Sequence, residues 1–111
     1  MRFGLKLMCE LRDARTLVRQ AQAGEDAGFE FAAISDHIHP WLPEHSHSPF
    51  AWSVLGAVAV RTTRLDLATG LTCPLLRYHP VIVAQAAATV ATLTDRQFTL
   101  AVGSFRRSPE P

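Results

Sequence analysis

The sequence predicts an α/β fold in which about four parallel strands carry helices on the outside. Short apolar segments alternate with helical segments, one pair in roughly every 30 residues, and this order is typical of parallel sheets with right-handed crossovers. No GxGxxG turn follows the first strand, which argues against a dinucleotide-binding unit. A doubly wound sheet and the N-terminal half of a TIM (β/α)8 barrel both satisfy this pattern.

The first half of the chain contains two strands around one helix. Residues 2–8 alternate apolar and polar side chains, which predicts a strand. Asp13 is a candidate N-cap, and the apolar face that follows it predicts a helix that Gly28 closes. The apolar residues 29–35 predict the second strand.

The second half repeats this alternation after a loop at residues 36–49, which holds four histidines and three prolines. The expected helices are residues 50–60 and 81–93, and the expected strands are residues 65–71 and 98–102. We expect residues 1–103 to form one domain. The tail, residues 104–111, lacks apolar periodicity and is expected to be disordered.

Composition favours a soluble globular protein, with 48% hydrophobic residues and a net charge of +1. That charge gives no argument for binding nucleic acid or a membrane, and the arginines are interpreted as a solvated surface. Cys9 and Cys73 are expected to be free thiols, since they form no CxxC pair. With no secretory signal and no membrane span in the sequence, a cytoplasmic location is expected.

An acid and an imidazole follow the second strand directly. In parallel α/β folds the carboxyl ends of the strands face the ligand crevice, so Asp36 and His37 would be delivered there together. His37 could take a proton from a substrate hydroxyl, because histidine titrates near neutral pH. The alternative is that Asp36 caps the loop backbone and His37 lies at the surface.

Other residues near this loop are weaker candidates. Two HxH pairs could ligate zinc or iron, but a loop rich in proline and serine offers no fixed geometry, so no metal is expected. Trp41 and Trp52 could wall a flat ring or simply pack. Gly70 within a strand indicates a bulge or a close approach of a ligand to the backbone.

Four separated blocks together resemble the luciferase-like class of coenzyme F420-dependent oxidoreductases, close to the F420-dependent glucose-6-phosphate dehydrogenase group. The blocks are Ser35-Asp36-His37 with Pro40-Trp41, Thr69-Gly70-Leu71-Thr72-Cys73-Pro74, Arg77-Tyr78-His79-Pro80 and Ala84-Gln85-Ala86. The resemblance covers residues 1 to about 103, and it implies the N-terminal part of a TIM barrel with a deazaflavin at its C-terminal mouth.

The resemblance also implies roles for single residues. His37 would be the catalytic base toward an alcohol-type, sugar phosphate-like substrate. Asp36, Trp41 and Cys73 would bind the cofactor. Gly70 and Leu71 would correspond to the family's non-prolyl cis peptide, which presses against one face of the deazaflavin.

The chain departs from the family pattern after the fourth strand. The family continues as Gly-Ser/Thr-Gly-Glu, whereas this chain reads Gly103-Ser104-Phe105-Arg106 and ends at Pro111. We therefore expect a truncated chain that is inactive alone and that pairs as a homodimer through its helices or exposed strand edges. The alternatives to F420 chemistry are an FMN-dependent luciferase-like monooxygenase and a non-catalytic fragment.

Overall fold

The computed structural model describes residues 1–36, 47–72 and 78–103, which form a four-stranded parallel sheet. Its strands are β1 (Gly4–Leu7), β2 (Phe31–Ile34), β3 (Asp66–Thr69) and β4 (Phe98–Thr99), and they lie in the order β1-β2-β3-β4. The expected four parallel strands in sequence order are confirmed. The expected disordered tail lies outside the described residues.

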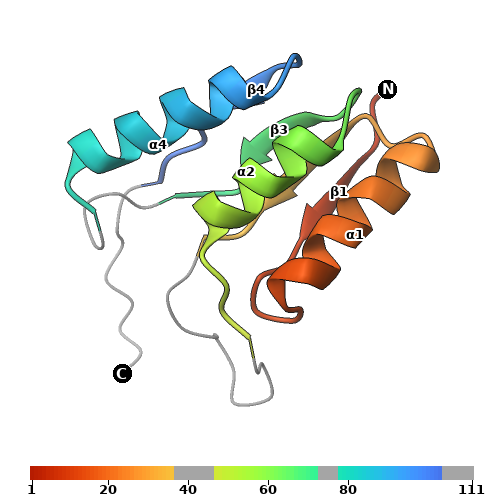
Figure 1. Ribbon diagram of the computed structural model, residues 1–111, viewed down its shortest axis with the longest axis horizontal. Helices are drawn as coiled ribbons and strands as arrows, with labels where there is room; N and C mark the ends of the chain where they lie inside the picture. Colours follow the sequence, from red (N-terminus) through yellow and green to blue (C-terminus); the bar gives the residue numbers. More distant parts are fainter. Residues whose placement is uncertain (37–46, 73–77, 104–111) are drawn as a thin grey trace.

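Three helices cover one side of this sheet: α1 (Ala14–Asp26), α2 (Ala51–Arg61) and α4 (Pro80–Leu93) (Figure 1). α2 packs between α1 and α4, as expected when each right-handed crossover advances by one strand in the same direction. A doubly wound sheet reverses its strand order and places helices on both faces. The described part of the chain therefore has the arrangement of the first half of a TIM barrel, which settles the choice that the sequence left open.

The core lies between the sheet and the helices. Alternate strand residues, Leu7, Ile34 and Leu67, are at most 1% exposed and pack against the buried faces of the helices. The largest helical contributions are Leu17 and Leu55, both fully buried. The other side of the sheet has no helix over it among the described residues, and it carries the exposed Lys6.

Local signals set the helix ends. Asp13 accepts a hydrogen bond from the Thr16 backbone N–H (3.0 Å), and Gly28 adopts a positive φ of 99° after α1, so both expected boundaries are confirmed. α4 begins with Pro80, and the His79 side chain caps it by accepting from the Val81 N–H (3.1 Å).

The fourth strand is shorter than the sequence predicted. β4 ends at Thr99 rather than at residue 102, because a side chain replaces the strand partner beyond that point. The Thr69 hydroxyl donates to the Ala101 carbonyl (2.8 Å) and accepts from the Ala101 N–H (2.9 Å). Parallel pairing returns only at the bridge between Thr72 and Val102. Residues 70 and 71 thus form a bulge, as expected from the glycine.

None of the helices in the described part of the chain is long and apolar enough to cross a bilayer.

Candidate functional site

The carboxyl edge of the sheet gathers the sequence-predicted residues that the structure describes. Asp36 follows β2, Gly70 follows β3 and Gly103 follows β4. The Gly70 N–H donates to the Ile34 carbonyl (2.7 Å), and the Gly103 N–H donates to the Thr72 carbonyl (2.8 Å). The prediction that these residues share one edge is confirmed. His37, Trp41 and Cys73 lie outside the described residues, so their roles remain predictions.

The Gly70–Leu71 peptide bond is cis, as the resemblance implied. It projects on the side of the sheet that carries no helix, where the Lys6 ammonium donates to the Gly70 carbonyl. A Cβ on Gly70 would lie 2.9 Å from Lys6 Nζ and 3.2 Å from Ala33 Cβ, so this bulge sits closely over the neighbouring strands. The side chains beneath it are therefore small or flexible.

The Leu71 side chain packs against Gly103, where there is no Cβ. A Cβ on Gly103 would lie 2.4 Å from Leu71 Cδ1, so any other residue at position 103 would force the leucine side chain to move. Leu71 is 46% exposed, so it presents apolar surface beside the bulge. Gly70, Leu71 and Gly103 together form what we call the bulge platform, a surface without polar side chains.

The Asp36 carboxylate lies beside this platform and is 7% exposed. The Thr72 hydroxyl donates to its Oδ2 (3.0 Å), and the Tyr78 hydroxyl donates to its Oδ1 (3.0 Å). These hydroxyls come from the end of the bulge and from the residue just before the α4 cap. Asp36 is thus held by groups that two later segments of the chain supply.

A second polar cluster lies under the same edge, after β1. The Ser35 hydroxyl donates to Glu10 Oε1 (2.6 Å) and accepts from the Cys9 N–H (3.0 Å). Burial raises the pKa of the Cys9 thiol to about 11, although the Ser35 hydrogen bond opposes that change. Cys9 therefore stays a protonated thiol at neutral pH, as a structural rather than a nucleophilic cysteine does.

Trp52 and the loop histidines were the weaker candidates for the site. Trp52 is 6% exposed and packs in the core, with its ring centroid 6.0 Å from that of Phe98, which agrees with the packing interpretation. The described residues include no group of three or more histidine, cysteine, aspartate or glutamate side chains placed to hold a metal ion. Of the loop histidines, only His47 is within the described ranges.

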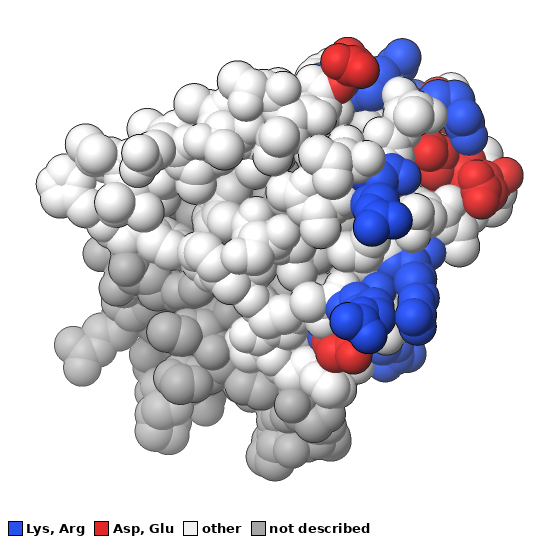
Figure 2. Space-filling view, in the orientation of Figure 1, with Lys and Arg blue, Asp and Glu red and all other residues white. Residues whose placement is uncertain are grey.

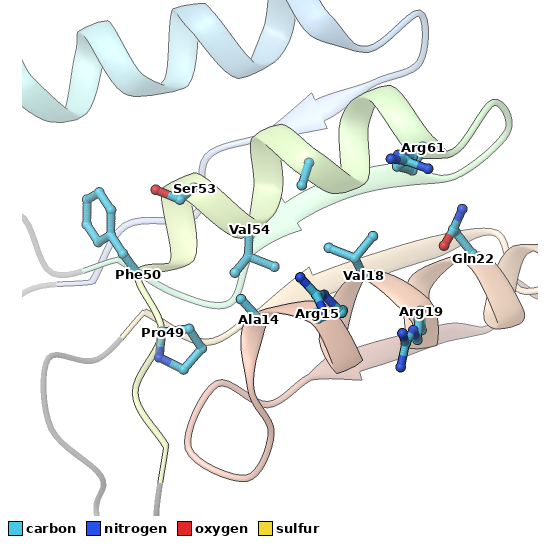
Figure 3. A pocket seen from close by; sticks show the side chains of 11 residues that line it. Ala14, Arg15, Val18, Arg19, Gln22, Pro49, Phe50, Ser53, Val54 and Arg61 are labelled. Atoms are coloured by element: carbon cyan, nitrogen blue, oxygen red, sulfur yellow. The ribbon is translucent and has the colours of Figure 1, made fainter.

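A separate groove runs between α1 and α2 on the outer surface, with a volume of about 590 Å³. Figure 3 shows Val18 and Val54 facing each other across it, with Arg15, Arg19 and Arg61 around them. Figure 2 shows that the arginines and lysines visible on this side gather over one half of the molecule. The groove lies on the helical side, so it is distinct from the platform on the other side of the sheet.

Sequence reasoning missed four residues of the site: Glu10, Lys6, Thr72 and Tyr78. Glu10 follows the first strand as Asp36 follows the second, so the same rule about strand ends would have found it. Thr72 and Tyr78 lay within the family blocks without an assigned role. Lys6 faces the uncovered side of β1, and its alternation with Leu5 and Leu7 was the available signal.

The comparisons with known proteins agree with this geometry. The family model described as luciferase-like monooxygenase matches residues 1–110. The F420-dependent hydroxymycolic acid dehydrogenase of Mycobacterium tuberculosis is 44% identical over 94 residues, which are 85% of this chain and 26% of that protein. The F420-dependent glucose-6-phosphate dehydrogenase of Mycolicibacterium gilvum is 40% identical over 104 residues, 94% of this chain and 31% of that protein. The chain thus spans about a third or less of the curated relatives it matches.

Solved structures give the same result. An F420-dependent secondary alcohol dehydrogenase in complex with an F420-acetone adduct superposes with a TM-score of 0.87 at 33% identity, over 92% of this chain and 31% of that one. The coenzyme F420-dependent tetrahydromethanopterin reductase of Methanopyrus kandleri superposes with a TM-score of 0.79 at 28% identity, over 95% and 27%. The fold, the site geometry and the family match over residues 1–110 lead to one assignment. This chain belongs to the luciferase-like monooxygenase family.

Proposed function

We propose that this chain supplies one side of the active site of an F420-dependent oxidoreductase that acts on an alcohol-type substrate. The observation that carries the proposal is the bulge platform beside a buried, hydroxyl-bound Asp36, in a chain 40% and 44% identical to F420-dependent dehydrogenases. The alcohol class comes from the relatives, whose names describe dehydrogenases of hydroxyl-bearing compounds. The whole protein's reaction is likewise a proposal.

The residues present fit a planar deazaflavin. The platform exposes the Leu71 side chain and two glycines, and the partly exposed Ala33 and Ala68 add no bulk on the same side of the sheet. A flat ring can approach such a surface closely, because its side chains are small or apolar and the two glycines leave their backbone uncovered. Lys6 contributes a positive charge at the edge of this surface. When bound, F420 would supply a ring that accepts or donates a hydride.

Different residues of the protein would then bind the cofactor and accept the substrate proton. The platform would hold one face of the ring and exclude water from it, and Asp36 would bind a polar group of the cofactor. His37, which follows Asp36 in the sequence, would accept the proton of the substrate hydroxyl while the carbon that bears the hydroxyl gives up its hydride. Trp41 and Cys73 would complete the same pocket. These roles follow from the family resemblance.

A fluorescence titration of the purified protein with F420 and with FMN tests the proposal. We expect F420 to bind at least about tenfold more tightly than FMN. Gly103→Ala should weaken F420 binding by about tenfold, since the new Cβ would displace Leu71 from the platform. Gly56→Ala is the matched control, because its nearest neighbour would be Leu93 Cδ1 at 3.8 Å and the helix tolerates alanine.

Equal binding of F420 and FMN would contradict the assignment of the cofactor. F420 binding that Gly103→Ala leaves unchanged would contradict the platform. No binding of either molecule would favour the non-catalytic alternative.

We also propose that two copies of the chain pair through α2 and α4. A groove of about 330 Å³ runs between these helices and is lined mainly by apolar residues, with Ile82 49% exposed and Leu93 43% exposed. The surface over α4 is uncharged in Figure 2. We expect sedimentation to show a dimer that Ile82→Glu dissociates, while Phe29→Glu, at an exposed phenylalanine outside α2 and α4, leaves it intact. A monomeric wild-type protein would contradict the pairing.

A further inference from the structure

We propose that Thr72 and Tyr78 are positioning residues, whose hydroxyl groups hold the Asp36 carboxylate in the orientation in which it binds the cofactor. We call these three residues the hydroxyl clamp. The inference rests on the proposed function and deepens it, because it assigns two side chains outside the Ser-Asp-His motif to the cofactor site.

The geometry fixes both carboxylate oxygens. Thr72 donates to Oδ2 and Tyr78 donates to Oδ1, each over 3.0 Å. The carboxylate cannot turn about its Cβ–Cγ bond without breaking one of these bonds. Asp36 is 7% exposed and Thr72 is 0% exposed, so little water is at hand to replace a lost hydroxyl.

The two donors are themselves held by their neighbours, Thr72 through backbone hydrogen bonds and Tyr78 through a ring contact. The Thr72 N–H donates to the Ala101 carbonyl (2.9 Å), and the Thr72 carbonyl accepts from Gly103 (2.8 Å). The Tyr78 ring lies 6.2 Å from the Phe50 ring, centroid to centroid. A group that binds a ligand works best when neighbours fix its rotamer beforehand, and the clamp meets that requirement.

The clamp also joins three parts of the site. Asp36 follows β2, Thr72 ends the bulge after β3, and Tyr78 precedes α4. The bulge platform and the carboxylate are therefore set relative to each other by the Thr72–Asp36 bond. Loss of either hydroxyl would leave the fold's hydrophobic core untouched, because Thr72→Val and Tyr78→Phe keep nearly the same side-chain volume.

F420 titrations of matched variants test the clamp. We expect Thr72→Val and Tyr78→Phe each to raise the dissociation constant for F420 by about tenfold. Thr72→Ser restores the hydroxyl and should bind within about twofold of the wild-type protein. Thr92→Val is the control, since it removes an exposed hydroxyl that donates to the Thr89 carbonyl of its own helix (2.7 Å).

A double-mutant cycle separates positioning from a purely structural role. If both hydroxyls act through the carboxylate, Tyr78→Phe should change F420 affinity by less than about twofold when Asp36→Ala has already removed both acceptor oxygens. Urea unfolding of the same proteins gives the second measurement. A structural role lowers the unfolding midpoint of Thr72→Val and leaves its F420 affinity unchanged, and that result would overturn the inference.

The two levels of the proposal fail in different ways. A wild-type protein that binds no F420 overturns the proposed function and the clamp together. A wild-type protein that binds F420, with Thr72→Val and Tyr78→Phe binding equally well, overturns the clamp alone. Full additivity of Tyr78→Phe and Asp36→Ala would also overturn it, because the tyrosine would then act independently of the carboxylate.

Discussion

Joining residues 1–103 of this chain to the remaining part of the F420-dependent hydroxymycolic acid dehydrogenase is expected to give a fusion that oxidises alcohols with F420. Residues 1–111 tested on their own correspond to 26% of that relative, so we expect them to bind F420 weakly and to show no turnover. The chain spans 26% of that relative and lacks the Glu of the family's Gly-Ser/Thr-Gly-Glu segment, which the fusion would supply after Gly103. The measurement is the loss of F420 absorbance with a panel of secondary alcohols and sugar phosphates.

His37→Ala in this fusion should lower turnover by ~10²–10⁴-fold, the usual contribution of a general base. F420 affinity should stay within about threefold, because the imidazole is assigned to the substrate and the platform to the ring. His79→Asn is the matched control: it replaces a histidine that caps α4 with another good capping residue, and turnover should remain within about twofold.

Comparable turnover by the unfused protein would show that the second part of the relative is not required. A fusion that binds F420 yet keeps its turnover after His37→Ala would remove His37 from the catalytic role. Each result would change a different part of the proposed function.

Glu25→Ala is expected to lower the free energy of unfolding by about 3 kcal/mol. Glu25 is 8% exposed, and its Oε2 accepts from the backbone N–H groups of Thr63 (2.9 Å), Arg64 and Leu65 (3.0 Å). Alanine would leave these donors in the turn before β3 without their acceptor, at ~1–3 kcal/mol for each buried group. Urea unfolding followed by circular dichroism gives the change.

Asp26→Ala is the control for this prediction, since it removes an exposed acid from the same turn of α1 and should cost less than about 0.5 kcal/mol. Burial alone would raise the pKa of Glu25, but the Arg64, Thr63 and Leu65 N–H groups lower it below its usual value. A lowered folded-state pKa means that the stabilisation is complete above the pKa of the unfolded chain and is lost as the pH falls through the lower pKa of the folded protein. The difference between wild type and Glu25→Ala should therefore shrink in acid, and a pH-independent difference would contradict this account.

Much of the fold could be predicted because its signals are local. Asp13 and Gly28 mark the ends of α1 through hydrogen bonding and a positive φ, and both signals are visible in single residues. The length of β4 could not be predicted in this way. It depends on the Thr69 hydroxyl replacing a strand partner at Ala101, a contact between residues 32 positions apart. The sequence also could not show whether the helices lie on one side of the sheet or on both, because that depends on the order of the strands.

Some residues of the candidate site could be predicted from local signals, and others could not. Asp36 and Gly70 were predictable because residues after parallel strands share one edge. Tyr78 was not, because it reaches Asp36 across 42 positions from the beginning of a helix. The family blocks contained Tyr78 and Thr72, but a motif gives spacing and not the direction of a hydroxyl group. Contacts formed by side chains of distant segments require the packed structure.

The strand order makes the stability of this sheet depend on pairs of neighbouring strands. In the described residues each strand pairs only with the one before it and the one after it, so the sheet's stability is close to a sum of nearest-neighbour interfaces. β2 and β3 are secured on two flanks, whereas β4 is secured on one. Fraying of β4 would release Gly103 from Leu71 and Ala101 from Thr72 while leaving the β2–β3 register in place. The platform would then loosen before the carboxylate does, because the platform depends on β4, an edge strand of the described sheet, and the carboxylate follows β2, an inner strand.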